Sequence, residues 1–261
     1  MSTIKTIVFP EGDNPKIIEA VERAKTDGIV IPILLQSNDH ENCLEDAAKM
    51  VANGQADSMI AGIDYTSRDV ILTTRDFIGM SGKTFTSSFI MEFPDGRKLV
   101  LADCATCKNP TAEQLADIVL QTSVVAEKVL QTKPKVAMLS FSTYRSGGKD
   151  PSIDKIHEAL EIIKSKNPDL IIDGELQLDA AMNPEIAAKK APNSPLRGEA
   201  NVLILPDLNS GNILYKALEQ LAGAKAYGPI LQGFNKPVSD LSRGSTVDDI
   251  YGVVSIISAI S

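Results

Sequence analysis

Short apolar runs alternate with amphipathic stretches along almost the whole chain. The runs at 6–10, 29–35 and 58–62 have the length and composition of buried strands, and the stretches between them repeat apolar residues at helical spacing. Strands that are apolar on both faces need helices on both sides, which favours a largely parallel sheet. The alternation therefore predicts an α/β protein.

The same pattern places most of the elements. Pro32 suggests that the strand at 29–35 lies at a sheet edge, because proline cannot donate a hydrogen bond to a neighbouring strand. Pro94–Arg97 has the turn chemistry of a β-hairpin. Further strands are expected at 135–140, 170–176 and 201–207, and helices from Pro15 to about Asp27 and at 41–52, 66–79, 111–130, 152–166, 179–190 and 211–222, with a last helix after Thr246.

The composition limits the kind of partner. The chain has 261 residues, 43% of them hydrophobic, a formal net charge of −8 and a pI near 4.9. This acidity argues against a nucleic acid or an anionic membrane as partner. No apolar run reaches membrane-spanning length and the first residues have no signal-peptide pattern, so we expect a cytoplasmic protein. Three scattered cysteines do not suggest a disulfide framework, and the single CxxC at Cys104 and Cys107 lacks the second pair of a zinc site.

The stretch from Asn235 to Ile250 concentrates the chemistry of an anion site just before the final helix. A guanidinium group offers a forked donor, glycine lets the backbone come close, and a helix start adds free N–H groups. An alternative is purely structural, because Thr246 and Asp249 have the spacing of a helix cap. The candidates for binding or catalysis here are Lys236, Ser242, Arg243, Ser245 and Asp249.

A second group of candidates follows the strands at 135–140 and 201–207. The loop 141–149 carries hydroxyls, two glycines and either Arg145 or Lys149, which suits a phosphate, although an ordinary polar loop has the same composition. Asn212 could donate to a substrate oxygen or cap the helix that follows it. The candidates in these segments are Ser142, Thr143, Ser146 and Asn212.

Three carboxylates stand close together in the stretch at 173–179. Asp173, Glu175 and Asp179 could suggest a metal site, but hydrogen bonding within the protein is the better interpretation.

Long, ordered runs of the sequence resemble one family. The stretch NKPVSDLSRGSTVDDI (235–250) resembles the C-terminal signature of phosphate acetyltransferases, which usually reads close to NKPVNDLSRGCSVDDI. The resemblance continues through LADCATCKNPTAEQLADI (101–118), KVAMLSFSTYRSG (135–147), PDLIIDGELQLDAA (168–181), APNSPLRGEANVLILPDLNSGNILYK (191–216), AGAKAYGPILQG (222–233) and the opening stretch 6–35.

The resemblance implies a fold and a division of the chain. Members of this family have two α/β domains around a cleft, similar to isocitrate and isopropylmalate dehydrogenases, and the C-terminal segment returns to the first domain. Carried over, this makes residues 1–83 with 229–261 the first domain and 84–228 the second. It also implies a homodimer with its contact on the second domain.

The resemblance further implies reversible acyl transfer between acetyl phosphate, or another acyl phosphate, and coenzyme A, with release of inorganic phosphate. Asp249 would accept the thiol proton, Ser242 would stabilise the developing negative charge and Arg243 would bind the phosphate. Coenzyme A is a substrate in this reaction, and the resemblance implies no other cofactor and no metal ion. The substrate-binding residues would be Ser142, Thr143, Ser146, Asn212, Lys236 and Ser245.

Three departures from the family pattern leave an alternative open. Several dozen residues that usually precede the segment 54–62, including an arginine, are missing. Leu72–Thr73 stands where an Arg-Pro pair is often found, with Arg68 and Arg75 nearby but shifted, and Ser245 replaces the usual cysteine. The alternatives are a weakened relative that binds coenzyme A or an acyl phosphate, and a transferase for propionyl or butyryl groups.

Overall fold

The structure, a computed structural model, describes residues 4–38 and 42–261. The chain forms two compact units, one made of residues 1–85 with 227–261 and the other of residues 86–226. The boundaries that we predict from the resemblance lie two residues away from these. Glu41, the expected start of a helix, lies outside the described residues.

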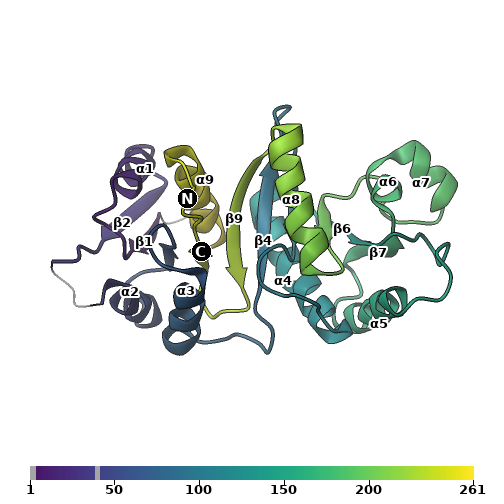
Figure 1. The fold of residues 1–261 in the computed structure, drawn as a ribbon, viewed down its shortest axis with the longest axis horizontal. Coiled ribbons are helices and arrows are strands. Elements are labelled where there is room, and N and C mark those ends of the chain that lie inside the picture. Colours follow the sequence, from purple (N-terminus) through teal and green to yellow (C-terminus); the bar gives the residue numbers. More distant parts are fainter. Residues whose placement is uncertain (1–3, 39–41) are drawn as a thin grey trace. The chain divides into compact units, whose positions relative to one another are not determined.

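Unit 1 is a mixed sheet with helices on both faces. Its elements are β1 (Lys5–Phe9), α1 (Pro15–Thr26), β2 (Val30–Leu34), α2 (Cys43–Ala52), β3 (Ser58–Ala61), α3 (Ser67–Thr73), the π-helical turn η1 (Thr74–Ile78), β9 (Lys225–Gln232), β10 (Val238–Asp240) and α9 (Val247–Ile260). The strand order is β2-β1-β3-β10-β9, parallel except for β9. Helices α1 and α9 lie on one face and α2 and α3 on the other (Figure 1).

Unit 2 also combines parallel and antiparallel strands with helices. Its elements are β4 (Thr86–Glu92), β5 (Lys98–Ala102), α4 (Ala112–Leu130), β6 (Lys135–Leu139), α5 (Pro151–Lys166), β7 (Ile171–Leu176), α6 (Leu178–Met182), α7 (Pro184–Lys190), β8 (Val202–Ile204) and α8 (Leu208–Ala222). The strand order is β4-β5-β8-β6-β7, and only the β4–β5 hairpin is antiparallel. The predicted hairpin at Pro94–Arg97 is therefore confirmed.

The α/β class is confirmed, while several element boundaries differ from the predictions. The predicted helix 66–79 ends as an α-helix at Thr73 and continues as η1. The predicted helix 179–190 is two helices, because Pro184 has no N–H to continue the first one and Asn183 caps the second. Strands β9 and β10 were not predicted, since Gly228 and Pro229 interrupt the apolar pattern and β10 is very short.

Each unit has its own apolar core. In unit 1, Val8, Met59 and Val238 from three neighbouring strands pack against helix α2. In unit 2, the rings of Phe89 and Tyr215 stack with centroids 4.3 Å apart where α8 covers its sheet. Strand β2 lies at the outer end of its sheet, as Pro32 predicted. In the part of the chain that the structure describes, no helix combines the length and apolar character needed to cross a membrane.

Candidate active site

The carboxyl ends of three parallel strands meet at one edge of unit 1. The loops after β1, β3 and β10 therefore lie together, in the place where ligands of α/β sheets usually bind. The buried carboxylate of Glu11, just after β1, accepts hydrogen bonds from the N–H groups of Gly62, Asp64 and Tyr65 at 2.6–3.0 Å. Glu11 thus fixes the loop after β3 to the end of β1.

Asp249 lies in the first turn of α9 and completes a capping box with Thr246. Its Oδ2 accepts hydrogen bonds from the Thr246 N–H (2.8 Å) and hydroxyl (2.7 Å), and the Thr246 hydroxyl accepts one from the Asp249 N–H. The capping interpretation of these two residues is therefore confirmed. Among the described residues, no hydrogen bond reaches the second carboxylate oxygen, Oδ1, so that atom remains available to accept a proton.

Ser242 and Arg243 occupy the exposed turn between β10 and α9. The Ser242 Oγ accepts a hydrogen bond from the Gly244 N–H at 3.3 Å, which leaves its own O–H free to donate. Within residues 4–38 and 42–261, the guanidinium group of Arg243 has no hydrogen bond or ion pair, and neither has the exposed ammonium group of Lys236. The turn therefore offers a positive charge that no carboxylate of the described residues neutralises.

Ser245, in contrast, is buried. Its N–H donates to the Ser242 carbonyl at 2.9 Å, and its own carbonyl accepts a hydrogen bond from the Lys16 ammonium group at 3.0 Å. Lys16 belongs to α1, so this contact fixes the turn before α9 to the helix that follows β1.

Asp240 ends β10 directly before this turn, and the residue is only 4% exposed. Within the described part of the chain, its Oδ1 has no hydrogen-bond partner. Burial raises the pKa of Asp240 to about 6; the Ser67 hydroxyl opposes this shift and the Glu11 carboxylate adds to it. A carboxyl with such a pKa changes its charge in the pH range in which many enzymes work.

The other arginines near the predicted site differ in their surroundings. Arg75 is paired with Asp76 at 2.8 Å and Arg145 with Asp154 at 2.8 Å. Arg68, at the start of α3, is exposed, and no described residue forms a hydrogen bond or ion pair with it. Of these three arginines, Arg68 is therefore the one without a neutralising partner in the described part of the chain.

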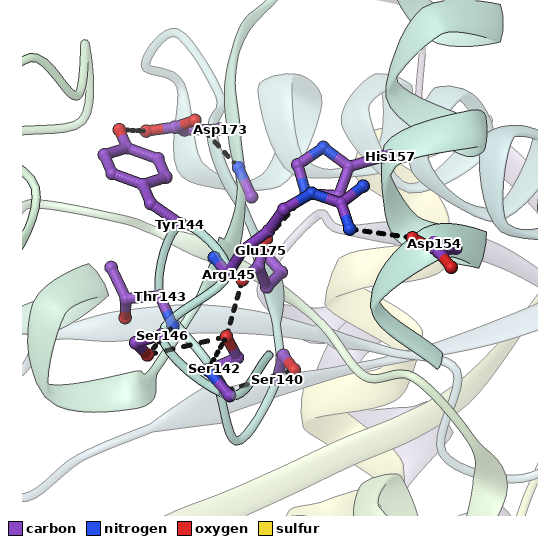
Figure 2. A network of polar contacts seen from close by, with 12 residues as sticks. Ser140, Ser142, Thr143, Tyr144, Arg145, Ser146, Asp154, His157, Asp173 and Glu175 are labelled. Atoms are coloured by element: carbon purple, nitrogen blue, oxygen red, sulfur yellow. Dashed lines mark hydrogen bonds and ion pairs between the residues drawn. The ribbon is translucent and has the colours of Figure 1, made fainter. Parts of the chain in front are cut away.

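In unit 2, the loop after β6 is held by its own side chains (Figure 2). The Ser142 hydroxyl is buried and donates to Glu175 Oε1 at 2.7 Å. Thr143 is also buried, and its hydroxyl accepts a hydrogen bond from the Gln177 N–H at 2.9 Å. Ser146 is exposed, and its oxygen accepts one from the Thr143 N–H at 3.0 Å. The structure thus brings these three predicted residues together, with two of them turned inward.

Glu175 lies at the centre of these contacts and is fully buried. His157 Nε2, from α5, donates to its second oxygen, Oε2, at 2.7 Å. Burial opposes ionisation of the carboxyl group, but the hydrogen bonds from Ser142, the Arg145 N–H and His157 outweigh it and lower the pKa of Glu175. Glu175 is therefore an ionised group inside the protein.

Asn212 lies one turn into α8 and does not cap this helix. The cap is Asp207, whose carboxylate accepts a hydrogen bond from the Ser210 N–H at 2.8 Å, so the helix begins earlier than we predicted. The Asn212 amide donates instead to the Cys104 carbonyl at 3.2 Å. No hydrogen bond between described residues connects Asn212 with the loop after β6.

Sequence reasoning missed Glu11, Lys16 and Asp240 as parts of the site, and it did not assign a role to His157. Glu11 and Asp240 could have been found from their position, because each stands where a strand ends at the carboxyl edge of the sheet. The contacts of Lys16 and His157 carry no signal in the sequence, since each joins residues that lie far apart along the chain.

Comparison with known proteins identifies the family. Residues 41–258 match the family described as "Phosphate acetyl/butaryl transferase". The chain is 47% identical over 217 residues to a phosphate acetyltransferase of Clostridium acetobutylicum, an alignment that covers 80% of this chain and 65% of that protein. The match therefore spans slightly less than two thirds of this relative.

Solved structures show the same likeness. A phosphotransacetylase from Streptococcus pyogenes matches with a TM-score of 0.90 and 36% identity, covering 98% of this chain and 93% of that one. A 4-hydroxythreonine-4-phosphate dehydrogenase from Burkholderia phymatum has a TM-score of 0.56 at 9% identity, covers 99% of this chain and 97% of that one, and shows the fold alone. The chain belongs to the phosphate acetyl/butyryl transferase family, a family of acyltransferases with a dehydrogenase-like fold.

Proposed function

We propose that this protein is a phosphate acetyltransferase, which transfers an acetyl group reversibly between acetyl phosphate and coenzyme A. The observation that carries the proposal is the turn before α9. Among the described residues, nothing pairs with Arg243, with the Ser242 O–H or with one carboxylate oxygen of Asp249, and these residues lie at the carboxyl edge of parallel strands. Coenzyme A serves as a substrate, and the reaction needs no further cofactor.

The chemistry follows from what each group can do. A thiol with a pKa of about 8.5 is mostly protonated at neutral pH, and Asp249 Oδ1 takes its proton as the sulfur attacks the acetyl carbonyl. A carbon–sulfur bond forms and the bond from the carbonyl carbon to the phosphate oxygen breaks. The Ser242 hydroxyl donates to the carbonyl oxygen while that atom carries negative charge, and Arg243 binds the leaving phosphate.

The first experiment is a rate measurement with purified protein, acetyl phosphate and coenzyme A, in which the absorbance of the thioester is followed. Arg243→Ala should lower kcat/KM by at least about a hundredfold, because a charged donor to the transition state is lost. Asp249→Asn should lower kcat by about 10²–10⁴-fold, because the proton acceptor is lost.

Two neighbouring residues provide matched controls. Asp248→Asn removes an exposed carboxylate that pairs with Arg23 at 2.8 Å, and Arg75→Ala removes an exposed arginine that pairs with Asp76. Both should retain nearly the full rate. A folded wild-type protein that forms no thioester from acetyl, propionyl or butyryl phosphate would contradict the enzymatic function and leave a binding protein. A rate measured only with propionyl or butyryl phosphate would mean that one of these, and not acetyl phosphate, is the substrate.

We further propose a homodimer that associates through helix α8, and a cytoplasmic location. Gly211 is the only buried residue among the described residues of α8, whereas Ile213 and Leu221 are 67% and 87% exposed. Two such side chains, eight residues apart, lie on the same side of the helix and favour association with another apolar surface. The three cysteines are present as thiols and not as disulfides, which suits a reducing compartment.

A further inference from the structure

We infer that Glu175 is a positioning residue of this enzyme: an internal anion that holds the loop 142–148, with His157 fixing its other oxygen. The inference rests on the proposed function and extends it to unit 2. Its basis is the set of contacts around one buried carboxylate, drawn in Figure 2.

The carboxylate of Glu175 takes the place that a bound anion would occupy in a loop of this composition. Its Oε1 accepts hydrogen bonds from the Ser142 hydroxyl at 2.7 Å and from the Arg145 N–H at 2.6 Å. The Ser142 oxygen in turn accepts a hydrogen bond from the Gly147 N–H at 3.0 Å. The carboxylate therefore holds Ser142 and Arg145 directly, and Gly147 through the Ser142 hydroxyl.

The remaining backbone donors of the loop are also engaged. Every N–H from Ser142 to Gly148 donates to an oxygen of the loop itself, of Ser140 or of Glu175. The loop therefore has no free backbone N–H in this segment with which to bind a phosphate. What it can present to a substrate are side chains, namely the Ser146 hydroxyl and the exposed Lys149, which has no hydrogen bond or ion pair with any described residue.

The conformation of the loop needs such support. Tyr144 and Arg145 have φ angles of 49° and 63°, in the left-handed region that side chains with a Cβ atom disfavour. The Tyr144 N–H donates to the Glu175 carbonyl at 3.3 Å, and the Arg145 N–H donates to its carboxylate. Since charge-assisted hydrogen bonds are roughly twice as strong as neutral ones, the ionised carboxylate stabilises a conformation that the loop would otherwise leave.

The substitution Glu175→Gln removes the negative charge of the side chain but keeps its size and shape. The Gln oxygen can keep the hydrogen bonds from Ser142 and Arg145, and the Gln amide can donate to His157 in its other neutral tautomer. Only the negative charge is lost. Asp173→Asn is the matched control, because Asp173 lies on the same strand and accepts a hydrogen bond from the Tyr144 hydroxyl at 2.6 Å at the exposed side of the loop.

The experiment measures kcat, both KM values and backbone hydrogen exchange of the segment 141–149 in the wild type, Glu175→Gln, Ser142→Ala and Asp173→Asn. We expect Glu175→Gln to raise the KM for acetyl phosphate or coenzyme A about fivefold, with kcat within about twofold and faster exchange in the loop. Ser142→Ala should change the same KM, because it breaks the link to Gly147, and Asp173→Asn should change neither KM.

Several results would overturn the inference. One is a Glu175→Gln protein with wild-type KM values, and another is unchanged exchange in the loop. A third is a change in KM in the Asp173→Asn protein as large as the change in the Glu175→Gln protein. If the wild type forms no thioester at all, the proposed function fails by itself. The Kd for coenzyme A, measured by calorimetry in the same variants, then replaces KM, and an unchanged Kd overturns the positioning role.

Discussion

Among single residues, the buried carboxyl of Asp240 makes the stability of the protein depend on pH. Its pKa of about 6 in the folded state lies above the unfolded value of about 3.9, so the folded state binds this proton more tightly. The stabilisation from this group is complete below about pH 4 and is lost as the pH rises through about 6.

The test compares urea unfolding of the wild type and Asp240→Asn between about pH 4.5 and about pH 7.5. Relative to the variant, the wild type should lose about 2 kcal/mol of unfolding free energy over this range. The subtraction removes the contribution of groups whose surroundings the substitution does not change. A difference that stays constant with pH would contradict the pKa and its cause, the burial of the carboxyl group.

At the scale of elements, the close approach of β3 to β10 depends on Gly62. A Cβ atom on this residue would lie 2.4 Å from Asp240 Oδ1 and 2.6 Å from the Leu241 carbonyl oxygen, and its φ angle is +113°. Gly62→Ala should therefore push the end of β10, which carries the Ser242–Arg243 turn, away from the end of β3. We expect a lower unfolding free energy together with a lower transferase rate.

Gly54→Ala is the control for backbone strain alone, because Gly54 also has a positive φ of +75°, but a Cβ atom on this residue would meet no other atom within 4 Å. Gly54→Ala should lower the unfolding free energy by about 1–2 kcal/mol. Gly62→Ala should cost at least about 2 kcal/mol more, since overpacking adds to the strain. If urea unfolding showed an equal loss of unfolding free energy in Gly54→Ala and Gly62→Ala, the ends of β3 and β10 would be able to separate without an energetic penalty.

At the scale of the whole molecule, Leu221 tests the proposed dimer. Leu221→Glu places a charge on the most exposed large apolar side chain of α8, and burying an unpaired charge in an interface is costly. Light scattering after gel filtration should show the wild type at twice the 28.0 kDa of one chain and the variant at 28.0 kDa.

Val124→Glu serves as the control for the dimer, because Val124 is 58% exposed but lies on α4. It should leave the assembly intact. A wild type that elutes as a single chain, or a Leu221→Glu protein that remains dimeric, would contradict an interface on α8.

Local sequence signals predicted much of the secondary structure for physical reasons that act within a few residues. Asn14 with Pro15, and Thr111 with Gln114, cap α1 and α4, and a cap depends only on its own turn. Pro184 showed the limit of this reasoning: it divides a stretch whose composition otherwise favours one helix. Strand β10 is too short for a periodic pattern, so only its pairing with β3 and β9 defines it.

The sequence by itself determined the α/β class, most helix starts, the β4–β5 hairpin and the presence of a hydroxyl, a guanidinium group and a helix start together at the Ser242–Arg243 turn, since these follow from neighbouring residues. Only the tertiary structure decided that Lys16 holds the Ser245 carbonyl, that Asp240 is buried beside Glu11, and that the Glu175 carboxylate accepts a hydrogen bond from the Arg145 N–H in the loop after β6. Each of these contacts joins segments far apart in the chain, and burial and hydrogen bonding between such segments exist only once the strands have paired.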